Sequence, residues 1–314
     1  MTGENMEIIV ILLLALILDL SLGDPPNAIH PVVWMGKLIS FMKRFEMGRT
    51  PTAQFVQGVL ITVMVTGLFT GAAFFILFYL RGFTIAYIII GAALLKSTFS
   101  LRGLRKAALS VRDSLLKNEI NKTRFELRSL VSRKTQGMSK EQLVSATVES
   151  VAESSCDSFI APLFYFLLFG IPGALAYRVV NTLDAMIGYR GKYEYLGKFS
   201  SKLDDLLNFI PARIAALLLI FASFVSRRGM HYVWQMALSE HRKTDSPNAG
   251  WPMAAMAGAL GVQLEKPGQY RLGTARTALI PQTIDASVQL LMIAASIWTA
   301  ICFATGGVYF ALTT

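Results

Sequence analysis

Six long apolar segments dominate the hydropathy pattern of this 314-residue chain. They cover Ile8–Leu22, Phe55–Leu80, Phe83–Leu95, Phe159–Val180, Phe209–Val225 and Ser287–Leu312. A helix that crosses a bilayer needs about 20 mostly apolar residues, so most of these segments are long enough. The third segment is short, and we expect it to pair with the second as a hairpin. An Ile-Pro-Gly sequence at 171–173 interrupts the fourth segment, which predicts a broken or re-entrant helix.

The pattern predicts an all-α, polytopic integral membrane protein with about five to six membrane-embedded helical segments and additional amphipathic cytoplasmic helices. The composition agrees, because only 16% of the residues are charged, against about 25% in soluble domains. There is no internal repeat and no low-complexity linker, so residues 1–314 are predicted to form a single membrane-embedded domain. Within it, 96–158 is expected to be a mainly extramembrane helical region and 226–286 a second extramembrane region.

The net charge of +10 is concentrated between the apolar segments. Of the 30 Lys and Arg residues, 4 lie in 23–54, 12 in 96–158 and 7 in 226–286. Basic loops favour the cytoplasmic side, so these regions are predicted to be cytoplasmic in a multi-pass protein of the cell membrane. Region 181–208 then falls on the opposite face, unless its flanking segments dip into the bilayer without crossing it. No nucleic-acid recognition motif accompanies the charge, so we expect a lipid bilayer and no nucleic acid as partner.

An acidic stripe lies on the helix that is predicted to begin at Lys140. Glu149, Glu153 and Asp157 recur every fourth residue and therefore share one helix face. Like charges at this spacing repel each other, and a divalent cation or a cationic substrate would remove the repulsion. A solvated acidic face is the alternative interpretation.

Other polar groups stand at the ends of apolar segments, where charges are costly and usually functional. The candidate binding residues are Asp24 and His30 after the first segment, Asn181, Asp184, Tyr189 and Arg190 after the fourth, Asp204, Asp205, Asn208 and Arg213 around the start of the fifth, and Ser246, Asn248 and Gly250 at a predicted helix start. Three of these residues also have a purely structural interpretation: Asn181 as a helix cap, Arg213 as a snorkelling side chain and His30 as a hydrogen-bonded loop residue.

Together these blocks resemble the CobD/CbiB family, the adenosylcobinamide-phosphate synthases (cobinamide synthases) of cobalamin biosynthesis. The resemblance covers roughly 19–270. It rests on Gly-Asp-Pro at 23–25 with His-Pro at 30–31, Glu-Ser and Ala-Glu within 149–153 followed by Asp157 and Ala-Pro-Leu-Phe at 161–164, Asn-Thr-Leu-Asp at 181–184 with Gly-Tyr at 188–189, Leu-Asp-Asp at 203–205 with Asn208 and Ile-Pro-Ala-Arg at 210–213, and Ser-Pro-Asn-Ala-Gly-Trp-Pro at 246–252.

The resemblance implies an ATP-dependent acid–amine ligase. Its reaction attaches aminopropanol, free or as its phosphate, to the free carboxylate of (adenosyl)cobyric acid and gives (adenosyl)cobinamide or its phosphate. ATP and Mg²⁺ are the implied cofactors, other corrinoid-pathway enzymes are possible partners, and no tightly bound prosthetic group is predicted. The implied catalytic residues are Glu149, Glu153, Asp157 and Asp184. Mg²⁺ is expected either on the first three of these or on Asp204 and Asp205, with Arg213 and the 246–250 turn facing phosphate.

Some positions depart from the family pattern, and two other classes of function stay open. Ser154 replaces an Asn, residues 244–245 are Thr-Asp where His-Pro is usual, Met253 replaces a Glu, and Lys266 adds a charge to a Gly-rich turn. These departures put any role of those positions in doubt. A transporter is the first alternative, because acids at membrane edges also mark substrate pathways. A non-enzymatic membrane regulator of related architecture is the second.

Overall fold

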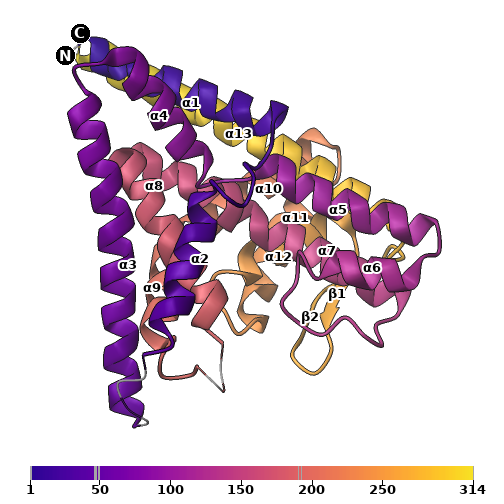
Figure 1. The fold of residues 1–314 in the computed structure, drawn as a ribbon. Coiled ribbons are helices and arrows are strands. Elements are labelled where there is room, and N and C mark those ends of the chain that lie inside the picture. The colour runs from indigo at the N-terminus through magenta and orange to yellow at the C-terminus, as the bar shows by residue number, and fades with distance from the viewer. Residues whose placement is uncertain (1, 46–47, 49, 190, 192, 314) are drawn as a thin grey trace. The chain divides into compact units, whose positions relative to one another are not determined.

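The computed structural model describes residues 2–45, 48, 50–189, 191 and 193–313. Almost all of its regular structure is helical, with one short antiparallel hairpin (Figure 1). The chain divides into two compact units, and each unit is built from separate stretches of sequence. The first comprises 1–100, 161–207 and 301–314, and the second comprises 101–160 and 208–300.

Helix packing around two long apolar helices builds the first unit. Its elements are α1 (Thr2–Ser21), α2 (Pro31–Met42), α3 (Pro51–Leu80), α4 (Thr84–Lys96), α8 (Ala161–Ile187), α9 (Lys198–Leu207) and the end of α13 (Pro281–Thr313). α1 packs on α4, while α3 packs on α8 and α9. α3 and α4 form the predicted hairpin, since only three residues separate them. Gly58 permits a close approach in this unit, because a Cβ there would lie 1.9 Å from the carbonyl oxygen of Leu196.

A buried small-residue helix organises the second unit. Its elements are α5 (Leu101–Leu116), α6 (Ile120–Leu127), α7 (Lys140–Ser155), the π-helical turn Cys156–Ile160, α10 (Phe209–Val225), α11 (Met230–Glu240), the 3-10 turn His241–Lys243, α12 (Gly250–Leu260), β1 (Gln263–Lys266), β2 (Tyr270–Gly273) and the first part of α13. α12 is rich in Ala and Gly and packs on α7, α10 and α11, because small side chains let helices approach closely. β1 and β2 pair antiparallel, with Gln263 opposite Gly273.

The starts of two helices can be compared with the capping residues that the sequence predicts. α7 begins as predicted, since Ser139 and Gln142 form a capping box. The predicted helix start at Ser246 and Pro247 is wrong by three residues, because α12 begins only at Gly250. The Ser246 hydroxyl instead accepts hydrogen bonds from the backbone N–H groups of Asn248 (3.2 Å) and Ala249 (3.3 Å). Such side-chain-to-backbone bonds close a turn that competes with the helix.

Helices of membrane-crossing length confirm the predicted class of fold. Among the described residues, four helical stretches are long and apolar enough to cross a bilayer: Pro51–Leu80, Thr84–Leu116, Lys140–Ile187 and Pro281–Gly306. Counting the bent pair α9 and α10 as one span gives a fifth. The break predicted in the fourth apolar segment is present, because Gly170 has φ 66° and ψ −161° and Pro172 follows it. The protein is therefore an all-α membrane protein with a broken helix.

Candidate functional site

Arg213 joins two of the blocks in the second unit. Its Nη1 donates to Asn248 Oδ1 (2.6 Å) and to the Phe209 carbonyl (2.8 Å), and its Nη2 lies 3.4 Å from the Pro247 carbonyl. The guanidinium also lies over the rings of Phe209 (3.9 Å) and Trp251 (5.1 Å). α10 supplies the arginine and the turn before α12 supplies Asn248. The arrangement therefore presents a fixed cation beside backbone and amide groups, which can bind an anionic or carbonyl-bearing ligand.

The turn that holds Asn248 is fixed from several sides. Asn248 is buried, and Ser246 closes the turn beneath it. Gly250 is required by packing, since a Cβ there would lie 2.0 Å from the His241 carbonyl oxygen. The His241 ring stacks on Trp251 with 3.8 Å between ring centroids. This geometry gives Gly250 a structural reason to be glycine that does not depend on a ligand.

In the second unit, three hydrogen-bond donors hold the carboxylate of Glu149 in place. Its carboxylate accepts hydrogen bonds from Ser145 (2.8 Å), Arg133 (3.1 Å) and the Tyr270 hydroxyl (2.8 Å), and the residue is only 4% exposed. Burial raises the pKa of Tyr270, and the charge of Glu149 raises it further, so the phenol stays protonated and donates. The Ser145 hydroxyl also accepts from the backbone N–H of Glu265 (2.9 Å), which ties β1 to α7. Glu149 therefore links α7 to the β-hairpin.

The other two members of the acidic stripe have different surroundings. Glu153 is exposed, and its charge contributes to the raised pKa of Tyr270. Asp157 is half-buried and lies in the π-helical turn that follows α7. Buried Asn208 accepts from the Cys156 thiol at 3.7 Å, which places it beside the same turn.

A second polar group lies in the first unit between α8 and α9. Asn181 Nδ2 lies 3.4 Å from Asp204 Oδ1, and Asp184 is hydrogen-bonded to Ser201 and interacts with the charge of Asp205. The structure thus brings together side chains from two blocks that are about twenty residues apart in sequence. Tyr189 is exposed, and Arg190 lies outside the described residues.

Asp24 and His30 also lie in the first unit, where Lys96 forms an ion pair with Asp24. Lys96 is 4% exposed, and its Nζ lies 3.0 Å from Asp19 Oδ1 and 2.8 Å from Asp24 Oδ1. Burial raises the pKa of Asp24, but hydrogen bonds from Lys96 and Ser100 outweigh that effect and leave the pKa below its ordinary value. Asp24 is therefore a carboxylate at neutral pH.

His30 caps α2 as a neutral imidazole. Its Nδ1 accepts a hydrogen bond from the backbone N–H of Val32 at 3.2 Å. Burial lowers the pKa of His30, and the positive charges of Arg178 and Lys96 lower it further against the opposing effect of Asp24. The influence of Arg178 places His30 near α8, the helix that also carries Asn181. The loop-residue interpretation of His30 therefore has direct structural support.

The acidic side chains differ in how well they fit Mg²⁺. Within the described part of the chain, no three His, Cys, Asp or Glu side chains converge as a metal cage. Mg²⁺ bound together with a nucleotide needs only one or two protein carboxylates, because phosphates and water fill the remaining positions. Asp184 and Asp205 are neighbouring carboxylates with Asn181 and Asp204 beside them, so their oxygen donors fit such a shared ion. Glu149 fits it less well, since three donors already occupy its oxygens.

Sequence reasoning missed three residues that hold these groups in place. Lys96 directly follows the third apolar segment and carries no motif, although a lysine at the edge of a span is itself a signal for a charged partner. Arg133 and Tyr270 both bind Glu149 from more than fifteen residues away in sequence. Only the fold brings them together.

The comparisons with known proteins agree on one family. The model of the CobD/Cbib protein family matches residues 12–301. The chain is 52% identical over 307 residues to cobalamin biosynthesis protein CobD of Dehalococcoides mccartyi, covering 98% of this chain and 99% of that protein. It is 44% identical to the probable cobalamin biosynthesis protein CobD of Methanothermobacter thermautotrophicus (84% and 86% covered) and 43% identical to that of Pyrococcus furiosus (82% and 85% covered). No solved structure matches the chain. The chain therefore belongs to the CobD/CbiB family and serves in cobalamin biosynthesis.

Proposed function

We propose that this protein joins aminopropanol, free or phosphorylated, to the free carboxylate of (adenosyl)cobyric acid with consumption of ATP. Its place in the CobD/CbiB family supports a corrinoid as substrate. An amide does not form spontaneously from a carboxylate and an amine, so ATP has to activate the carboxylate. Transfer of the γ-phosphoryl group to a carboxylate oxygen gives an acyl phosphate and releases ADP. Attack of the amine on its carbonyl carbon then releases phosphate and one proton.

The Arg213–Asn248 contact is the observation that carries this proposal. A guanidinium that is oriented by an amide and two carbonyl groups, and shielded by two aromatic rings, is suited to developing negative charge. We assign Arg213, Asn248 and Ser246 to an anionic group of a substrate. The activity then depends chiefly on positioning and charge stabilisation, as in other phosphoryl transfers.

The carboxylates take the complementary role. We assign Asp184, Asp204 and Asp205 to Mg²⁺ or to the substrate ammonium, with Asn181 as an oxygen donor beside them. Bound Mg²⁺ would neutralise charge on phosphate oxygens. Glu153, which is exposed, is the candidate for accepting the amine proton, while Asp157 remains a candidate ligand. Glu149 acts through Arg133 and Tyr270 as a positioning residue. We expect this chemistry at the cytoplasmic side of the cell membrane, where other corrinoid-pathway enzymes can exchange substrates.

Product analysis tests the reaction and the identity of the amine. Purified protein in detergent receives cobyric acid, Mg²⁺-ATP and either aminopropanol phosphate or free aminopropanol. We expect an ATP-dependent cobinamide product, and the productive amine identifies the donor. A folded sample that gives no product with either amine would contradict the ligase assignment and favour the transporter or regulator classes.

A further inference from the structure

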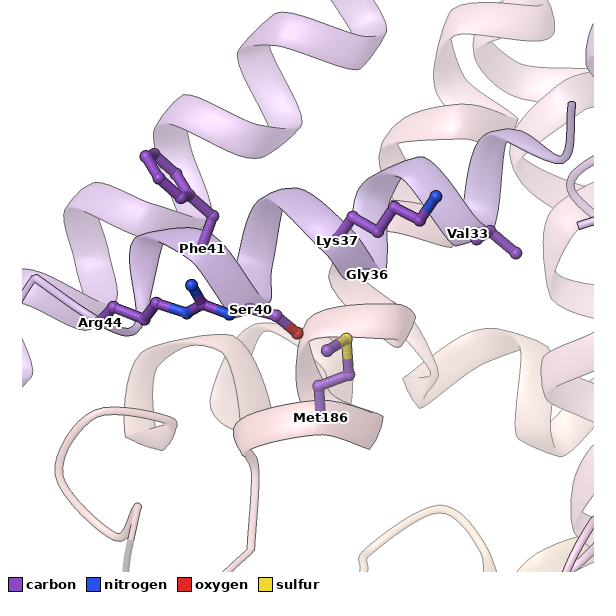
Figure 2. Close-up of a pocket in the computed structure, with 7 residues that line it drawn as sticks. All are labelled: Val33, Gly36, Lys37, Ser40, Phe41, Arg44 and Met186. Carbon is purple, nitrogen blue, oxygen red and sulfur yellow. The ribbon is translucent and has the colours of Figure 1, made fainter. Parts of the chain in front are cut away.

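A basic hollow lies in the first unit at α2. It has a volume of about 550 Å³ and is open to the surface. Its lining consists of five α2 residues, the following Arg44, and Met186 of α8, namely Val33, Gly36, Lys37, Ser40, Phe41, Arg44 and Met186. Figure 2 shows Arg44 and Val33 at the two ends of the labelled group, with Ser40 and Met186 near its centre and Lys37 between them and Val33.

The spacing along α2 explains why this hollow exists. Gly36 and Ser40 are one helical turn apart, and their small side chains leave space beside Met186. A Cβ on Gly36 would already lie 3.5 Å from the Met186 sulfur, so a larger side chain would fill the gap. Lys37 lies in α2, and Arg44 lies seven residues later, in the turn that follows the helix. Seven residues are about two helical turns, so both residues lie on the same face.

The charged side chains that line the hollow are all positive. Lys37 and Arg44 are both exposed, and no acidic side chain lines the hollow in the described part of the chain. Among those described residues, neither cation takes part in an ion pair, whereas Lys96 in the same unit is paired twice. Two cations with a hydroxyl between them are suited to phosphate oxygens.

The surroundings of the hollow are those of a membrane interface. α2 is apolar but has only 12 residues, too few to cross a bilayer. It packs on α3, a helix of spanning length, and exposes Trp34 and Phe41, and Phe45 just after it is also exposed. Phe41 and Phe45 contact each other edge to face at 4.9 Å. Exposed aromatic side chains beside basic ones are typical of helices that lie in the headgroup region.

We propose that the hollow formed by Lys37, Ser40, Arg44 and Met186 binds the phosphodiester headgroup of an anionic phospholipid. Lys37 and Arg44 contact the phosphate, and Phe41 and Phe45 contact the start of the acyl chains. Basic pockets beside transmembrane helices bind anionic headgroups in this way. The site does not depend on the proposed ligase reaction, so either proposal can fail without the other.

Quenching of tryptophan fluorescence by brominated lipid tests the site. The full-length protein is placed in phosphatidylcholine nanodiscs that contain a small fraction of brominated phosphatidylglycerol or, in parallel, brominated phosphatidylcholine. Trp34 lies one turn before Lys37, and subtracting the signal of W34F isolates its emission. We expect an association constant for phosphatidylglycerol about thirtyfold above that for phosphatidylcholine, since two nearby cations together add on the order of 2 kcal/mol of attraction.

Charge-matched variants separate the site from general attraction. K37Q/R44Q should abolish the preference for phosphatidylglycerol, while K43Q/K198Q, which removes two charges of the same unit outside the hollow, should keep it. Unaltered thermal unfolding in detergent shows that both variants are folded. A preference that survives in K37Q/R44Q, or that K43Q/K198Q loses equally, would overturn the proposal. Loss of the preference in millimolar inorganic phosphate would also overturn it, because the site would then take soluble phosphates.

Discussion

Nη1 of Arg213 lies 2.6 Å from Oδ1 of Asn248, which joins two motif blocks that are 35 residues apart in the chain. Arg213→Lys keeps the charge but loses the planar fork that contacts the amide and two carbonyls. We expect kcat/KM of the ligation to fall by roughly tenfold to a hundredfold, because the charge is no longer oriented. Arg242→Lys is the matched control at an exposed position of the same unit. Equal activity of the Arg213 and Arg242 variants would contradict a role in substrate binding.

Two neighbouring glutamates should respond differently to the same substitution. Glu149→Gln breaks a buried ion pair with Arg133, so we expect about 2–3 kcal/mol lower unfolding free energy. Glu153→Gln changes an exposed residue, so stability should stay within about 0.5 kcal/mol while ligation is lost. Thermal or denaturant unfolding in detergent, measured beside product formation, separates the two effects. Full activity of Glu153→Gln would remove this residue from the catalytic set.

Lys96 should be a strong determinant of stability in the first unit. Lys96→Met removes the cation that lies 3.0 Å from Asp19, a residue only 1% exposed. Leaving that carboxylate buried without its cation should lower the unfolding free energy by about 3 kcal/mol. Adding Asp19→Asn removes the stranded charge and should recover part of the loss. A double variant no more stable than Lys96→Met would show that packing, and not charge, causes the defect.

The cap of α2 should make stability depend on pH. The pKa of His30 is lowered in the folded protein, so between that lowered value and its ordinary pKa of about 6.5 the unfolded chain binds more protons. The stabilising contribution is therefore complete above about pH 6.5 and is lost as the pH falls towards the folded-state pKa. His30→Asn keeps a capping side chain without this titration. Unfolding curves at pH 7.5 and 5.5 should show a smaller pH effect in the variant than in the wild type.

The sequence predicts the class of fold because apolar length and small-residue composition are local properties. The hairpin of α3 and α4, the capping box at Ser139 and the break near Pro172 all follow from residues within a few positions of each other. The start of α12 could not be predicted in this way. The Ser246 hydroxyl accepts hydrogen bonds from the backbone N–H groups two and three residues later, so the helix begins after this turn.

The candidate site could be predicted only as a set of positions. Glu149 and Glu153 look equivalent in sequence, but Arg133 and Tyr270 reach only the first of them. Their different roles depend on contacts across more than fifteen residues, which periodicity cannot supply. The basic hollow was likewise invisible, since it requires Met186 of α8 to lie opposite Gly36 of α2.

Oxygen-18 transfer is the most direct measurement of the central claim, that this protein activates a corrinoid carboxylate with ATP and converts it to an amide. Cobyric acid labelled with oxygen-18 in its free carboxylate is incubated with the protein, Mg²⁺-ATP and the productive amine. We predict that each amide formed delivers one labelled oxygen to the inorganic phosphate released. Cobinamide formed without label in phosphate, or label transfer that needs no ATP, would contradict the account.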